Sequence, residues 1–216
     1  MSNTLFCLAV WMGLVLGLTG CQLPLTRLNT PPSGSVLFQD DFSSPAGRWQ
    51  MTLEDVGLAG AYKGTFRFLV KAPEVQIWST PGLEFASARI EVDVARFGGP
   101  EENRMGLICR YRDPENYYFF IISGDGYYAV GKVTGGKPVL LGQEQMQYSA
   151  AVQTGWAINH LRADCVGNTL TLYVNYLPVA LVHDDDHTGG DVGLLAGTFE
   201  QTGVDVIFDN FVVIQP

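Results

Sequence analysis

Two acidic residues near the middle of the chain have a spacing that suits hydrolysis. Glu91 and Asp93 stand two positions apart in IEVDVAR (90–96), so both carboxylates lie on one face if this segment is a strand. Glycoside hydrolysis uses a pair of carboxylates about 5–10 Å apart across the scissile bond. Both residues also alternate with apolar neighbours, which is the ordinary pattern of a strand with one solvated face. We therefore expect this pair to be solvated and not catalytic.

A short acidic segment offers a second chemistry, cation binding. In HDDDHTGGD (183–191), Asp184, Asp186 and the residues after them imitate the first half of a calcium-binding loop. The position at which such a loop needs a bidentate glutamate holds Leu195, so the match fails. We expect a solvated acidic loop, with a loose cation site or a catalytic role as the alternatives. The sequence contains no motif of a serine or zinc hydrolase and no phosphate-binding glycine loop.

The most aromatic stretch of the chain has the side chains of a sugar-binding surface. Sugars stack their C–H faces on aromatic rings while planar polar groups bind their hydroxyls. In NYYFFIISGDGYY (116–128), strand alternation places Tyr117 and Phe119 on one face and Tyr118 and Phe120 on the other. One of the two faces must belong to the core.

The charge of Arg110 indicates which face is wet. Since arginine is seldom buried, we expect the strand face that carries Arg110 to be solvent-exposed, together with rings from the strands beside it. The expected ligand-binding residues are Arg110, Tyr118, Phe120, Tyr128 and Lys132. Core and cross-strand packing would explain most of these rings without any ligand, and that alternative stays open.

The amino-terminal segment is typical of an exported protein. No charged side chain precedes Arg27, and residues 5–18 form an apolar run of the length of a signal-peptide core. The run ends in LTGC, which resembles the lipobox of bacterial lipoproteins and predicts lipidation of Cys21. We expect a signal peptide over 1–20, a flexible tether over 21–35 and a folded domain over 36–216. An ordinary signal peptide or a membrane anchor are the alternatives, and all three place the domain outside the cytoplasm, with the lipid anchor placing it at the cell membrane or envelope.

Processing at this site would leave two cysteines in the mature protein. Cys109 and Cys165 both fall in expected strands, and alternation points both side chains toward the core. An exported pair tends to oxidise, so we expect a disulfide between them, with two buried free thiols as the alternative. A bridge across 56 residues would stabilise the fold by about 4 kcal/mol in the loop-entropy model.

Composition and periodicity together predict an all-β fold. Segments 65–71, 87–97 and 168–175 alternate apolar and polar residues, and turn pairs such as Asp125-Gly126 and Gly135-Gly136 separate the expected strands. Strands with one wet and one dry face pack as two antiparallel sheets. The 13 basic and 22 acidic residues give a formal charge of −9, which argues against nucleic acid as a partner.

Five blocks of sequence resemble one known group of domains. They resemble the concanavalin A-like (LamG-like) jelly-roll domains of bacterial surface lipoproteins. That group is related to the 3-keto-disaccharide hydrolase domain family and, more remotely, to glycoside hydrolase family 16. The resemblance covers roughly residues 36–214. The blocks are DDFSSPAGRW (40–49), MGLICRYRDPENYYFFIISGDGYYAVGKV (105–133), NHLRADCVGNTLTLYVN (159–175), GDVGLLAGTF (190–199) and VIFDNFVV (206–213).

The resemblance implies a jelly-roll sandwich, a glycan ligand and a structural Ca²⁺. Such folds often carry a Ca²⁺ that joins the first and last strands, for which Asp209 and Asp41 are the matching carboxylates here. Family 16 places its catalytic carboxylates as Glu-x-Asp-x-x-Glu, whereas this chain has Arg96 at the third position. We therefore expect a lipid-anchored module that binds carbohydrate without catalysis. A glycoside-acting enzyme of the 3-keto-disaccharide hydrolase type and a protein-binding subunit of an envelope complex are the alternatives.

Overall fold

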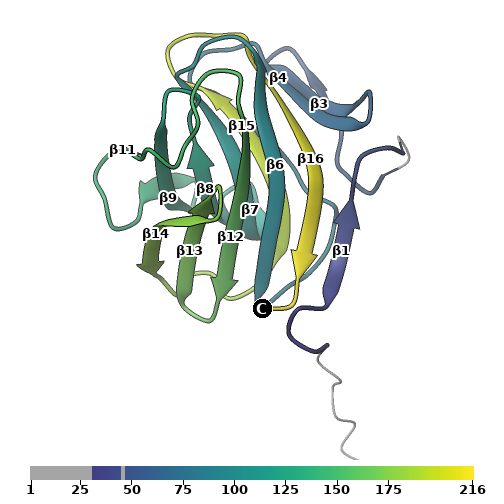
Figure 1. Ribbon diagram of the computed structural model, residues 1–216, viewed down its shortest axis with the longest axis vertical. Coiled ribbons are helices and arrows are strands. Elements are labelled where there is room, and N and C mark those ends of the chain that lie inside the picture. The colour runs from purple at the N-terminus through teal and green to yellow at the C-terminus, as the bar shows by residue number, and fades with distance from the viewer. Residues whose placement is uncertain (1–30, 45–46) are drawn as a thin grey trace, which may run out of the picture. The chain divides into compact units, whose positions relative to one another are not determined.

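The alternating segments of the sequence form strands in a computed structural model, which describes residues 31–44 and 47–216 (Figure 1). The expected signal peptide, Cys21 and most of the tether lie outside the described residues. Phe66, Phe68 and Val70 are buried, as their alternation predicts, because they point from one face of their strand into the core. The described residues contain no helix that could span a membrane.

The larger of the two sheets has nine antiparallel strands in the described part of the chain. Their spatial order is β14-β13-β12-β6-β16-β4-β3-β2, and β1 also pairs with β16. The strands are β1 (Val36–Asp40), β2 (Thr52–Glu54), β3 (Gly57–Tyr62), β4 (Thr65–Val70), β6 (Ala88–Gly98), β12 (Ile158–Val166), β13 (Thr169–Val174), β14 (Leu177–His183) and β16 (Val204–Ile214).

The smaller sheet has seven strands, again antiparallel, in the order β10-β9-β8-β7-β15-β5, with β11 paired to β9. The aromatic stretch forms β8 and the start of β9, and the predicted turn at Asp125-Gly126 joins them. The strands are β5 (Gln76–Ser79), β7 (Asn103–Asp113), β8 (Asn116–Ile122), β9 (Tyr127–Thr134), β10 (Lys137–Leu140), β11 (Gln147–Tyr148) and β15 (Asp191–Thr198).

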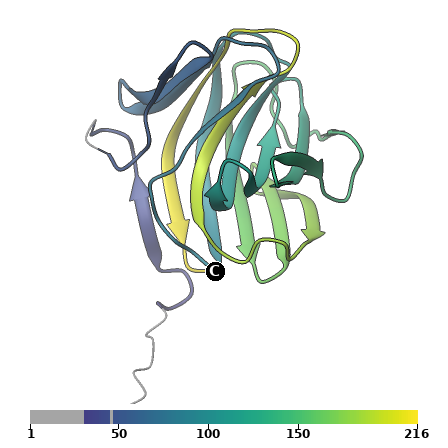
Figure 2. The same ribbon diagram turned by 180° about the vertical axis from the view of Figure 1, so that it is seen from behind.

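The main core lies between the two sheets, which face each other in both views of the ribbon (Figures 1 and 2). Its largest fully buried side chains include Phe66, Phe68 and Phe208 from the nine-stranded sheet and Tyr118 and Phe120 from the seven-stranded sheet. The expected fold, a two-sheet antiparallel concanavalin A-like jelly roll, is confirmed.

A disulfide crosses this core between Cys109 of β7 and Cys165 of β12, and so links the two sheets covalently. Both cysteines are buried, as their alternation predicts. Disulfides persist in oxidising compartments, so the bond is consistent with the expected location outside the cytoplasm.

Candidate functional site

A cleft of about 490 Å³ lies on the outer face of the seven-stranded sheet, the face turned away from the main core. Its floor belongs to a second apolar cluster, distinct from the main core, which includes Ile108 of β7, Ile121 of β8 and Val133 of β9. The register of β7 and β8 sets Ile108 opposite Phe119, so both side chains lie on this outer face. A cleft of this size matches the range typical of small-molecule sites.

Three rings line up across the outer face beside the cleft. The rings of Tyr111 and Tyr117 have centroids 5.7 Å apart, and Trp78 lies 6.0 Å from Tyr117. Trp78 Nε1 donates a 3.1 Å hydrogen bond to the hydroxyl of Tyr111, and Gln76 Nε2 donates a 3.0 Å bond to the hydroxyl of Tyr117. Burial raises the pKa of Tyr117 to about 12, so this phenol is neutral at ordinary pH.

The floor of the cleft depends on the absence of a side chain at Gly131. A Cβ added there would lie 2.2 Å from the ring of Phe119, because the ring lies across the β9 backbone at this position. Phe119 and Gly131 are paired residues of β8 and β9. The glycine therefore lets the Phe119 ring lie flat on the sheet as part of the cleft floor.

Polar groups stand on the cleft wall next to these rings. Arg104 of β7 is half-buried, and its guanidinium lies 4.2 Å from the ring centroid of Phe199, a cation–π contact. Burial lowers the pKa of Arg104 below its usual value. Gln76 and the exposed Glu74 complete the polar lining. Rings beside planar donors and acceptors can stack on a sugar ring and bind its hydroxyls.

The prediction that Tyr118, Phe120 and Tyr128 lie on a solvent-exposed, ligand-binding face is wrong. Tyr118 and Phe120 are completely buried in the main core, because the β7–β8 register sets them opposite Cys109 and Leu107. Tyr128 is partly buried and packs against the same core. Alternation splits the rings of β8 between two faces as predicted, but the cleft lies on the face of Tyr117 and Phe119.

Arg110 is also placed differently from the expectation, since it is only 3% exposed. The pairing of β7 with β8 shifts register after Cys109, and Arg110 adopts a positive φ of 53°, as in a β-bulge. The bulge turns its side chain inward, where Nη1 donates to the carbonyl of His187 and Nη2 to the carbonyl of Gly167. Arg110 therefore fixes two loops and does not face solvent.

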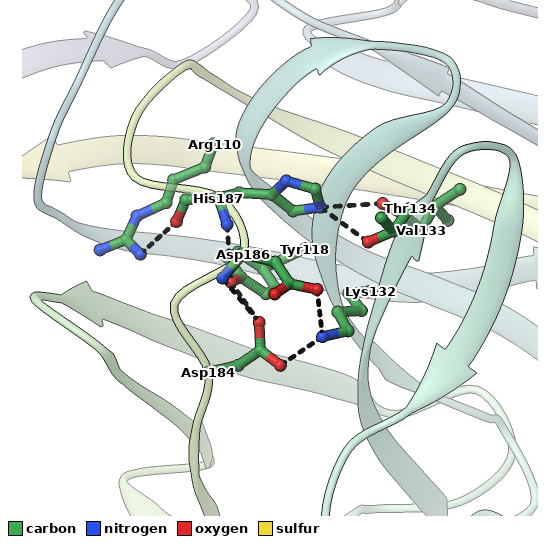
Figure 3. Close-up of polar contacts among 8 residues, drawn as sticks. All are labelled: Arg110, Tyr118, Lys132, Val133, Thr134, Asp184, Asp186 and His187. Atoms are coloured by element: carbon green, nitrogen blue, oxygen red, sulfur yellow. Dashed lines mark hydrogen bonds and ion pairs between the residues drawn. The ribbon is translucent and has the colours of Figure 1, made fainter.

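Lys132, the fifth expected residue, belongs to a polar network with Tyr118 and the acidic loop (Figure 3). Its ammonium group pairs with Asp184 and lies 2.6 Å from Asp186. The hydroxyl of Tyr118 donates a 2.6 Å hydrogen bond to Asp184 and accepts one from the backbone N–H of His187. The acidic loop is thus tied to β8 and β9 through Asp184 and Asp186, whereas Asp185 is exposed, as expected for a solvated loop.

The carboxylates Glu91 and Asp93 lie far from the cleft in the fold, on the outer face of the nine-stranded sheet. His160 lies between them, with Nδ1 2.8 Å from Asp93 and Nε2 3.5 Å from Glu91. Its ring is stacked against Tyr176. Both carboxylates thus contact the same histidine of β12.

The two carboxylates expected to bind Ca²⁺ line different hollows. Asp41 lines one with Asn210 and Phe211, and Asp209 lines a second with Asp93. Asp41 also accepts hydrogen bonds from the backbone and side chain of Ser43. Among the described residues, no group of three or more His, Cys, Asp or Glu side chains is placed to hold a metal. Calcium binding by these two aspartates stays a prediction.

The fold is that of a concanavalin A-like, galectin-like β-sandwich. No protein-family model matches the chain, and no curated protein matches its sequence. Solved structures match its fold. The carbohydrate-binding module CBM66 from Bacillus subtilis is 16% identical over 78% of this chain and 96% of its own, with a TM-score of 0.54.

Two further structures share the sandwich. A protein of unknown function with a galectin-like fold from Bacillus subtilis is 14% identical, with a TM-score of 0.64 over 85% of this chain and 97% of its own. The Bacillus licheniformis beta-glucanase is 12% identical, with a TM-score of 0.60 over 83% of this chain and 97% of its own. At these identities the similarity shows the fold alone.

Proposed function

We propose that this protein is a carbohydrate-binding module and that the cleft on the outer face of the seven-stranded sheet holds the glycan. The observation that carries the proposal is the cleft lining, in which the rings of Tyr117, Phe119 and Phe199 adjoin the polar groups of Gln76 and Arg104. The fold that this protein shares with a carbohydrate-binding module and a beta-glucanase also supports a carbohydrate ligand.

Binding without hydrolysis is the form of this function that we propose. Glycoside hydrolysis uses two carboxylates across the scissile bond, and Glu74 is the one carboxylate among the described residues that line the cleft. Glu91 and Asp93 lie on the other sheet. We further propose that Cys21 carries lipid and holds the module at the outer side of a membrane, as the LTGC motif indicates.

A panel of soluble polysaccharides, both neutral and acidic, tests the binding function by affinity gel electrophoresis. Met146 lines the cleft, so Met146→Trp fills part of it and is expected to weaken retention about tenfold or more. Tyr176→Ala is the matched control, because it removes a ring that is 80% exposed and lies outside the cleft lining. Retention by none of the polysaccharides, or equal retention of the wild type and Met146→Trp, contradicts the proposal.

A further inference from the structure

Arg104 differs from the other arginines of the described residues in having no acceptor for its guanidinium. The other seven donate to carboxylate, carbonyl or hydroxyl oxygens. Even Arg110, which is almost completely buried, donates to two carbonyls. Within the described ranges, the side chain of Arg104 makes neither an ion pair nor a hydrogen bond, and Arg104 is the arginine that lines the cleft.

An unpaired guanidinium in this position is costly for the fold alone. Arg104 is half-buried, and burial disfavours its charged form, as the lowered pKa shows. Buried or half-buried charged groups are usually paired, since desolvation is otherwise not offset. The Phe199 ring at 4.2 Å offsets part of this cost and holds the guanidinium at the cleft wall.

The geometry of a guanidinium selects its partner. It presents five N–H donors in one plane, and two parallel donors match the two oxygens of a carboxylate. A sugar hydroxyl uses these donors one at a time and brings no charge. A ligand carboxylate would thus supply the acceptor that every other described arginine already has.

Glu74 is the opposing charge in the cleft. It is exposed, whereas Arg104 is half-buried, and no salt bridge joins the two in the described structure. Its attraction acts on Arg104 through solvent, which screens it, and its repulsion of a ligand carboxylate is screened in the same way. Glu74 therefore weakens, without cancelling, the preference of Arg104 for an anion, and it can accept hydrogen bonds from sugar hydroxyls.

We infer that the cleft takes a carboxylate-bearing sugar, such as a uronic acid residue of an acidic polysaccharide, with the carboxylate on Arg104 and the sugar ring against the neighbouring aromatic side chains. This inference rests on the proposed function, since it assigns the class of glycan to the same cleft.

The test compares acidic polysaccharides with their own carboxyl-reduced forms, which keep the sugar rings and lose the charge. The probes are polygalacturonate, alginate, glucuronoxylan and hyaluronan, each run in both forms against the purified protein. At least one acidic form is expected to be retained about tenfold more strongly than its reduced counterpart. Arg104→Gln is expected to remove that difference by weakening retention of the acidic form, with less than about threefold change for the reduced form. Glu74→Gln is expected to strengthen retention of the acidic form.

The reduced form serves as the internal control for folding, because a misfolded Arg104→Gln variant would retain neither the acidic nor the reduced polysaccharide. Equal or stronger retention of the reduced forms overturns the acidic-sugar inference and leaves the carbohydrate-binding function standing. An unchanged preference in Arg104→Gln also overturns the inference. If the protein retains neither form of any probe and no neutral polysaccharide, the inference and the proposed function are both overturned.

Discussion

The side-chain amide of Gln76 donates a 3.0 Å hydrogen bond to the hydroxyl of Tyr117 and thereby joins β5 to β8 across the two strands between them. The bond fixes a polar group and an aromatic ring at the same wall of the cleft. Tyr117→Phe keeps the ring and leaves the Gln76 amide without this acceptor. We expect the free energy of unfolding to fall by about 1–2 kcal/mol. Urea denaturation of the variant and of wild type measures this loss of stability, and equal midpoints would count against the structural role of the bond.

The same phenol predicts a pH dependence of stability. Burial raises the pKa of Tyr117 to about 12 in the folded state, against an ordinary value of 10. The unfolded chain therefore loses the phenolic proton first, so the folded state is destabilised as pH rises from 10 toward 12. Denaturation of wild type and Tyr117→Phe at pH 8 to 11.5 checks this. The difference between the two curves should shrink with rising pH, and a constant difference would contradict the assignment.

Asp184 stabilises the polar network that ties the acidic loop to β8 and β9. Burial alone would raise the pKa of Asp184, but hydrogen bonds from Lys132 and Tyr118 outweigh it and lower the pKa below its usual value. A lowered folded-state pKa adds stability above the ordinary pKa, which is lost as pH falls through the lower value. Asp184→Asn should thus cost about 1–3 kcal/mol at pH 7, and this cost should shrink progressively as pH falls below 3.8, the ordinary pKa of an aspartate.

Thermal melts from pH 7 down to 2.5 measure this difference. Asp186→Asn is the control, since Asp186 is the more exposed partner of Lys132 and should contribute less than about 1 kcal/mol. If the two variants lose equal stability at pH 7, the larger contribution expected of Asp184 is contradicted.

The disulfide between Cys109 and Cys165 closes a separation of 56 residues and joins the two sheets through the core. In the loop-entropy model such a bridge stabilises the fold by about 4 kcal/mol. The double variant Cys109→Ala with Cys165→Ala should therefore melt about 10 °C lower than the oxidised protein. Calorimetry checks the shift, and a midpoint within about 2 °C of wild type would show that the bond does not stabilise the fold.

Calcium binding is tested through the same midpoint. If Asp209 or Asp41 binds Ca²⁺, excess Ca²⁺ should raise the melting temperature by several degrees relative to a chelator, because a ligand of the folded state stabilises it. Asp209→Asn or Asp41→Asn, whichever removes a ligand of the ion, should abolish the increase. A midpoint that is the same in Ca²⁺ and in chelator would rule out a stabilising site at the ends of the chain.

The strand pattern was predictable wherever polarity alternates. Ile90, Val92 and Val94 of β6 are buried, and the charged residues between them are not, because a strand with one wet face has only one register that buries its apolar side. The same rule predicts that Cys109 and Cys165 point into the core, whereas their bond was expected from the oxidising environment of an exported protein. For these segments the sequence alone determines which side chains form the core.

The face of β8 that carries the cleft was not predictable in this way. Tyr117 and Tyr118 are chemically identical, and apolar residues occupy both faces of the strand, so alternation has no polarity to act on. The expected face depends on the charge of Arg110, and the β-bulge there breaks the alternation between Arg110 and Ile108. Arg104, six residues earlier and before the bulge, lies on the cleft face and was the better guide to it.

The first and last strands place both described ends of the chain side by side. β1 pairs with β16, and Gly34 already donates a hydrogen bond to the carbonyl of Gln215 at the same end of the sandwich (Figure 1). If Cys21 is lipidated, as we propose, a pull between the membrane and a glycan held in the cleft passes through β1 into β16. Antiparallel partners loaded along their length share the force among all their backbone hydrogen bonds. A five-residue strand can thus serve as the mechanical attachment of the whole module.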